Sequence, residues 1–132
     1  MKYLLDTHIV IWWLANDARL DSPKRALLDG EVRQMRTIGI SDFTLWEIAM
    51  LGERGRLEFV GKIDTWLDAL VGHPAVFVLP IDHRIALDAV RLPTPFPRDP
   101  ADRLIAATAR VHGLTLVTQD RAIASSGLLA TA

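Results

Sequence analysis

Four short apolar runs alternate with longer helix-like segments along this chain, and no other feature restricts its fold as much. The runs are rich in Val, Ile and Leu and have the length of buried strands. They lie at residues 2–5, 37–41, 75–79 and 114–118. Helices between consecutive strands are the crossover connections that a parallel sheet requires. The pattern therefore predicts an α/β fold with a central parallel sheet flanked by helices.

The segments between these runs contain helix signals. Residues 7–15 are almost continuously apolar, which predicts a helix with few solvated positions. Ser22 and Pro23 suit the N-cap and first position of a second helix, which Gly30 is expected to end. The other predicted helices lie within residues 42–56, 61–72, 82–90 and 99–113. Glycines are expected to end the first of these at positions 52 and 55.

Length and composition indicate one cytoplasmic domain. A chain of 132 residues buries roughly 68% of its unfolded surface, so we expect residues 1–132 to form a single domain. The absence of cysteine excludes disulfides, thiolate metal sites and cysteine nucleophiles. Residues 9–15, the longest apolar run, are too few to span a membrane, and Asp6 interrupts any signal peptide. With a net charge of -1, nucleic-acid binding would need a local basic patch.

Acidic residues follow the predicted strands, at the edge where parallel sheets bind ligands. Asp6 follows the first strand and Asp120 follows the last. Aspartate at a strand-to-helix junction is most often an N-cap. We expect Asp42 and Asp82 to cap helices or lie at the surface. Asp99 precedes a proline at the first helical position and is therefore also a predicted cap.

Three acids are expected to face inward. Asp6 interrupts an apolar run, Glu47 lies in mid-helix on the face of Phe43 and Met50, and Asp102 shares its face with small residues. An exposed helix edge would also explain Glu47. Two unit charges 4 Å apart repel by about 4 kcal/mol at an effective dielectric of 20, so an acidic cluster needs a cation or a raised pKa. Without cysteine or paired histidines, carboxylates favour Mg²⁺ or Mn²⁺ over Zn²⁺.

Four motifs together resemble the PIN-domain ribonucleases, and among them the VapC toxins of bacterial toxin–antitoxin pairs. The motifs are YLLDTHIVIWWL, SDFTLWEIA, PRDPADRLIAATA and LTLVTQD, at residues 3–14, 41–49, 97–109 and 114–120. They follow the order and spacing of the family over nearly the whole chain. The resemblance implies a PIN-like α/β/α sandwich with an acidic pocket that binds Mg²⁺ or Mn²⁺.

The resemblance also implies which residues form that pocket. The implied catalytic acids and metal ligands are Asp6, Glu47, Asp102 and Asp120. Asp99 matches a further acid and is kept as a second-line ligand or helix cap. Thr7 and Thr118 match hydroxyl positions that flank the site, and Ser41 begins the helix of Glu47. His8 could line the pocket, although a surface or packing role is the stronger expectation.

Basic residues at the rim would hold the RNA backbone. Arg98 and Arg103 form one candidate patch beside the pocket, although Arg103 could instead pair with Asp99. A second candidate patch comprises Arg54, Arg56 and Lys62. A solvated surface is the alternative explanation for both patches.

The function implied by the resemblance is hydrolysis of RNA phosphodiesters by a metal-dependent endoribonuclease. It also implies a homodimer and a cognate VapB-like antitoxin. Two alternatives remain open: a metal-dependent DNA nuclease that uses the same acids, and a silent PIN-fold module that binds RNA or protein without cutting. We further expect either Trp12 or Trp13 to reach a dimer or antitoxin surface.

Overall fold

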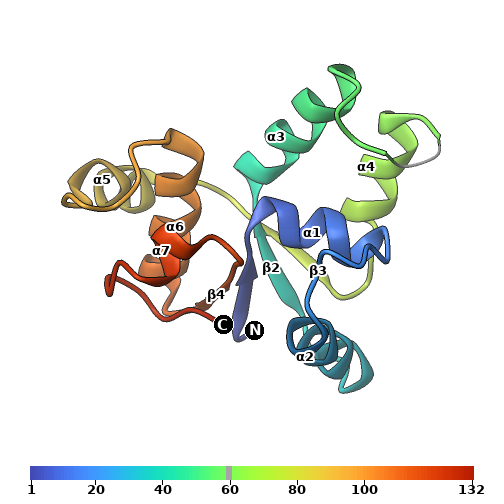
Figure 1. Cartoon of the computed structure of the whole chain (residues 1–132), viewed down its shortest axis with the longest axis horizontal. Coiled ribbons are helices and arrows are strands. Elements are labelled where there is room, and N and C mark those ends of the chain that lie inside the picture. Colours follow the sequence, from blue (N-terminus) through green and yellow to red (C-terminus); the bar gives the residue numbers. More distant parts are fainter. Residues whose placement is uncertain (59–60) are drawn as a thin grey trace.

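The computed structural model describes residues 1–58 and 61–132, and these residues form a four-stranded parallel sheet between helices (Figure 1). The strands are β1 (Tyr3–Leu5), β2 (Ile38–Ser41), β3 (Val76–Leu79) and β4 (Thr115–Val117). Their order in the sheet is β3-β2-β1-β4, and each neighbouring pair is parallel. The α/β class and the four strands predicted from the sequence are confirmed.

Seven helices occur in the described residues. They are α1 (Thr7–Leu14), α2 (Ser22–Arg33), α3 (Asp42–Glu53), α4 (Ile63–Val71), α5 (His83–Arg91), α6 (Pro100–His112) and α7 (Arg121–Ala124). The six predicted helices are present, and α7 forms in a tail for which no element was predicted. None of these helices combines the length and the apolar character needed to cross a bilayer.

The predicted ends of α2 were wrong. Asp21, not Ser22, is the N-cap, because its carboxylate accepts a hydrogen bond from the Lys24 amide at 2.9 Å. Gly30 lies inside the helix, which continues to Arg33. A single glycine in a helix costs only about 1 kcal/mol relative to alanine, so packing can override it as a stop signal.

Gly52 lies within α3 for a packing reason. A Cβ atom at this position would lie 2.6 Å from Cδ1 of Ile63, the first residue of α4. The bare glycine therefore lets α4 pack closely against the last turn of α3. Gly55, with a φ of 64°, lies in the turn that follows the helix, as predicted.

Side chains alternate between the two faces of the sheet and build a core on each side. On one face, Leu5, Ile40 and Val117 pack with residues of α1, α2, α3 and α4. On the other face, Leu4 and Leu116 pack with residues of α6 and α7. Helix α5 packs on α6, farther from the sheet. Both faces are thus covered, and α1, α3 and α7 begin just beyond the carboxyl ends of β1, β2 and β4 (Figure 1).

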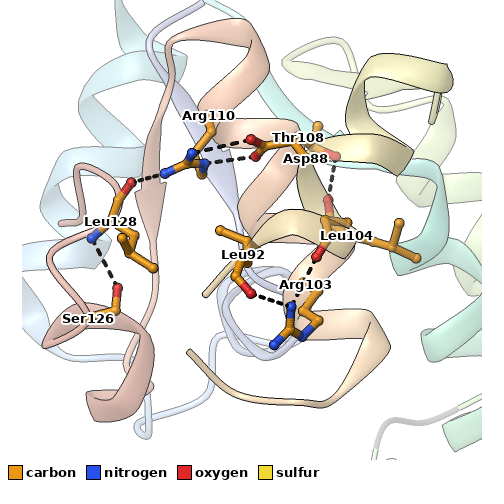
Figure 2. Close-up of polar contacts among 9 residues, drawn as sticks. Asp88, Leu92, Arg103, Leu104, Thr108, Arg110, Ser126 and Leu128 are labelled. Carbon is orange, nitrogen blue, oxygen red and sulfur yellow. Dashed lines mark hydrogen bonds and ion pairs between the residues drawn. The ribbon is translucent and has the colours of Figure 1, made fainter. Parts of the chain in front are cut away.

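The C-terminal tail covers the free edge of β4. Leu116 pairs with Thr131 in parallel, and the Leu116 amide donates to the Ala130 carbonyl at 2.9 Å. The Arg110 guanidinium joins this tail to the helices, because it forms a two-point contact with Asp88 of α5 and donates to the Leu128 carbonyl (Figure 2). These contacts hold the C-terminal tail against β4 and against the helices α5 and α6.

Candidate active site

Five carboxylates line one pocket of about 380 Å³ at the carboxyl edge of the sheet. They are Asp6 beyond β1, Glu47 on α3, Asp99 and Asp102 at the start of α6, and Asp120 beyond β4. The rest of the lining comprises Thr7, His8, Ile9, Trp12 and Gln119. The structure therefore brings together acids that are as far apart in sequence as residues 6 and 120. Neither lysine nor arginine from the described residues contributes to the lining.

Asp6 is held by hydrogen bonds to both of its carboxylate oxygens. Oδ1 accepts from the Thr7 amide at 2.8 Å, and Oδ2 accepts from the Thr118 hydroxyl at 2.8 Å. The Thr118 oxygen itself accepts from the Asp120 amide at 3.0 Å. Burial raises the pKa of Asp6, and the hydrogen bonds from Thr118 and Thr7 oppose this effect. The carboxylate is thus fixed in position, while its charge lies in an environment that disfavours it.

Glu47 is half-buried and bonded to a hydroxyl of α1. Its Oε1 accepts from Thr7 Oγ1 at 2.5 Å, and Thr7 Oγ1 lies 3.1 Å from the hydroxyl of Thr44. Burial raises the pKa of Glu47, the Thr7 bond lowers it, and the negative charges of Asp6 and Asp99 raise it further. Thr44 is not among the site residues predicted from the sequence. Its position one helical turn before Glu47, on the same face, was the available signal.

Asp102 has the largest perturbation in the pocket. Burial, followed by the charges of Asp99, Asp6, Asp120 and Glu47, raises its pKa to about 7. All four neighbouring charges are negative and act in the same direction. The pocket therefore holds its carboxylates at an electrostatic cost, which a bound cation would relieve.

Three of the acids cap helices, because Asp6 caps α1 through the Thr7 amide and two others cap α6 and α7. The Asp99 carboxylate accepts from the amides of Ala101 at 2.8 Å and Asp102 at 3.4 Å, which is the predicted N-cap of α6. Asp120 accepts from the Ile123 amide at 3.1 Å and caps α7. For Asp99, the cap and the place beside the pocket are therefore compatible.

The chain matches a known protein family over most of its length. The family model of the PIN domain matches residues 3–126. The chain belongs to the PIN-domain family. This PIN domain is 37% identical over 122 residues to Ribonuclease VapC22 of Mycobacterium tuberculosis, in an alignment that covers 92% of this chain and 89% of that protein. The PIN fold and the likeness to VapC proteins expected from the sequence are confirmed.

Solved structures have the same PIN fold. One is VapBC2 from Rickettsia felis bound to a promoter DNA fragment, with a TM-score of 0.73, 20% identity, and coverage of 100% of this chain and 98% of that one. Another is FitAcB from Neisseria gonorrhoeae, with a TM-score of 0.66, 25% identity, and coverage of 98% and 95%. These similarities extend along both chains from end to end, so the PIN fold includes nearly all of this sequence.

The donor atoms of this PIN domain suit a hydrated divalent cation. Among the described residues, no three acidic or histidine side chains are arranged to hold a bare ion between them. A hard cation bound through one or two carboxylates and several waters needs no such cage. The negative pocket and the raised pKa values of Asp6, Glu47 and Asp102 fit an ion of this kind.

Several predicted site residues lie beside or away from the pocket of the PIN domain. Thr118 is buried behind Asp6, and Ser41 is fully buried, where its hydroxyl caps α3 by accepting from the Phe43 amide at 3.1 Å. His8 is both exposed and part of the lining, so it lies at the rim. Arg98 is exposed and outside the lining.

Arg103 binds backbone carbonyls rather than an acidic side chain. Its guanidinium donates to the carbonyl of Leu92 at 2.9 Å (Figure 2) and to that of Ala89 at 3.1 Å. The ion pair with Asp99, which the sequence left open as an alternative for Arg103, does not form among the described residues. The side chain is instead used to join the end of α5 to α6, and this orientation gives no support to a contact with RNA.

The two acids expected at caps or at the surface differ from each other. Asp82 caps α5 by accepting from the Ile85 amide at 2.9 Å, as predicted. Asp42 is half-buried and neither caps its helix nor lies at the surface. One of its oxygens accepts from the Ile81 amide at 3.2 Å, and the other is buried without a partner in the described part of the chain.

Proposed function

We propose that this PIN domain is a divalent-metal-dependent endoribonuclease and the toxin of a VapBC-type toxin–antitoxin pair. The main support is the pocket of five carboxylates with no basic side chain from the described residues, in which the pKa of Asp102 rises to about 7. The 37% identity to Ribonuclease VapC22 supports RNA as the substrate class. We propose that residues 1–132 act as one domain in the cytoplasm.

The proposed cofactor is Mg²⁺ or Mn²⁺. We propose that the ion is held directly or through water by Asp6, Glu47, Asp102 and Asp120, with Asp99 as a further ligand. When bound, it supplies positive charge for the scissile phosphate and increases the acidity of a water molecule. The residues of the chain orient the ligands, because Thr7 and Thr118 fix Asp6 before substrate arrives.

We propose that RNA crosses the pocket beside Trp12. This half-buried side chain lines both the acidic pocket and an adjoining hollow of about 100 Å³ that also includes Arg19 and Arg56. The Arg19 guanidinium lies 5.5 Å from the centroid of the Trp12 ring and is paired with Asp17 at 2.7 Å. Exposed aromatic faces stack on unpaired bases, and arginines approach phosphates. Of the basic residues predicted from the sequence, Arg56 has the position that this path requires.

Replacing Trp12 with alanine tests the path of the RNA. Loss of one stacking platform costs about 1–3 kcal/mol, so a short single-stranded RNA should bind roughly 5- to 150-fold more weakly. Fluorescence anisotropy of labelled RNA in EDTA measures this without cleavage. Trp46→Ala is the matched control, because Trp46 is 57% exposed and lies outside both hollows. Equal losses in the two variants, or none in Trp12→Ala, would contradict the path.

A VapB-like antitoxin and a second copy of the chain are the proposed protein partners. The structural relatives include complexes from toxin–antitoxin systems, which supports the first. Trp13 is only 8% exposed, whereas Trp12 is half-buried. Trp12 is therefore the tryptophan that could reach a partner, and the interface itself stays a prediction.

Cleavage assays on the purified protein test the proposed activity. Total RNA and a tRNA pool should be cut with Mg²⁺ or Mn²⁺ and left intact in EDTA. Cleavage of DNA but not RNA would favour a DNA nuclease. RNA binding without cleavage under any of these conditions would favour the silent module.

A further inference from the structure

Two buried threonine hydroxyls meet behind the acidic pocket. Thr7, at the start of α1, is 2% exposed, and Thr44, in α3, is 0% exposed. Their Oγ1 atoms lie 3.1 Å apart, and Thr7 Oγ1 lies 2.5 Å from Oε1 of Glu47. Thr44 does not line the pocket. Among the described residues, the hydrogen bond to Thr7 is the one that links the Thr44 hydroxyl to the site.

The number of protons sets the direction of these hydrogen bonds. A hydroxyl has one proton to donate, and an ionised carboxylate can only accept. The short distance between Thr7 and Glu47 is typical of an O–H···O⁻ bond, so the Thr7 proton belongs to that contact. Thr7 then has no proton for Thr44, and Thr44 must donate to Thr7. The chain of donors therefore runs from Thr44 through Thr7 to Glu47.

Thr108 is a buried helical threonine that does not contact the acidic pocket. It is also 0% exposed, but its hydroxyl donates to the Leu104 carbonyl one turn earlier, at 2.7 Å (Figure 2). This local bond is the usual one for threonine within a helix. The hydroxyl of Thr44 instead contacts a residue 37 positions away in sequence.

The opposite side of the pocket repeats the arrangement. There the Asp120 amide donates to the Thr118 hydroxyl at 3.0 Å, and that hydroxyl donates to Oδ2 of Asp6 at 2.8 Å. In each case one donor bonds to a threonine hydroxyl, and that hydroxyl donates to one oxygen of an acid. Thr44 has the same relation to Thr7 that the Asp120 amide has to Thr118.

We infer that Thr44 is a positioning residue of the cation site, whose hydroxyl orients Thr7 and thereby holds Oε1 of Glu47. The other oxygen, Oε2, accepts no hydrogen bond from the described residues and is the one left for a cation. This inference rests on the proposed metal-dependent function. It adds a residue that has no contact with cation or substrate.

Mn²⁺ binding, measured by titration calorimetry at constant pH, tests the inference. Removal of a hydrogen bond behind a metal ligand typically weakens metal binding by about 10- to 100-fold, and we expect the lower value for Thr44→Val. Thr44→Ser restores the hydroxyl and should bind Mn²⁺ nearly as tightly as the wild type. Thr108→Val is the matched control, because it also removes a fully buried threonine hydroxyl but should leave Mn²⁺ affinity unchanged.

A Glu47→Gln background separates positioning from general damage. There, Thr44→Val should cause little additional loss of Mn²⁺ affinity, because the carboxylate that it positions is absent. If the valine variant does not fold, Thr44→Ala removes the same hydroxyl without adding a methyl group. Wild-type affinity in the folded Thr44 variant, or equal losses in Thr44→Val and Thr108→Val, would overturn the inference and leave the proposed function standing. A wild-type protein that binds no Mn²⁺ would overturn both.

Discussion

Asp6→Asn is expected to lower the rate of RNA cleavage at least about a hundredfold, because a catalytic cation contributes several kcal/mol and each 1.36 kcal/mol is tenfold in rate. The variant keeps the shape of the side chain but removes one negative charge from the pocket. Asparagine can still accept one of the two hydrogen bonds that Thr7 and Thr118 donate to Asp6. The fold should therefore survive while cation binding fails. Initial rates on a tRNA pool with saturating Mn²⁺ measure the effect.

Asp82→Asn is the matched control for this substitution. Asp82 also follows a strand and precedes a helix, but it is exposed and outside the acidic pocket. Its carboxylate caps α5 through the Ile85 amide, and asparagine is an equally good N-cap. The cleavage rate of Asp82→Asn should match that of the wild type. Unchanged cleavage by Asp6→Asn would exclude Asp6 from the catalytic site.

Asp102→Asn is expected to stabilise the metal-free protein at pH 8. The pKa of Asp102 is about 7 in the folded state against 3.8 in the unfolded chain, mainly because of burial and then of the charges of Asp99 and other acids. A raised carboxyl pKa gives stability that is complete below pH 3.8 and is lost as the pH rises through 7. Wild-type protein at pH 8 therefore bears the cost of an ionised Asp102, and the amide removes it.

The expected gain is about 1–2 kcal/mol, after the full effect is reduced for the solvent screening of a half-buried group. This corresponds to an increase in Tm of roughly 3–8 °C. Circular dichroism melts in EDTA at pH 4 and pH 8 measure it, and the difference should disappear at pH 4. Excess Mn²⁺ should reverse the order, because the wild type gains the free energy of binding. A lower Tm for the variant at pH 8 in EDTA would contradict the prediction.

The opposite effects expected of Asp102→Asn with and without Mn²⁺ reflect a compromise in this pocket between stability and cation binding. Among the described residues, four of the five acids are held by caps, amides and hydroxyls rather than by neutralising bases. Each of these contacts orients a carboxylate before any ion arrives. Preorganisation of this kind destabilises the protein without a cation and favours the form with a bound cation.

Local signals in the sequence were enough to predict the strands and most helices. Runs of β-branched residues and the cap at Asp99 act over a few positions, so they can be read without knowing the tertiary contacts. Signals that depend on packing failed. Gly52 lies inside its helix, where α4 packs closely on it. Arg103 donates its hydrogen bonds to backbone carbonyls at the end of α5.

The sequence by itself determined that this is a parallel α/β protein with acids beyond its strands, because strand and helix periodicities and junction residues are local properties. Tertiary structure alone decided that β4 lies beside β1, which brings Asp120 and Thr118 to Asp6. It also decided that Thr44 lies against Thr7 and so behind Glu47. These contacts join residues that are 37 and 112 positions apart in the sequence, and they depend on how the helices pack on the sheet. Side chains from the whole core determine that packing, so no single stretch of sequence encodes it.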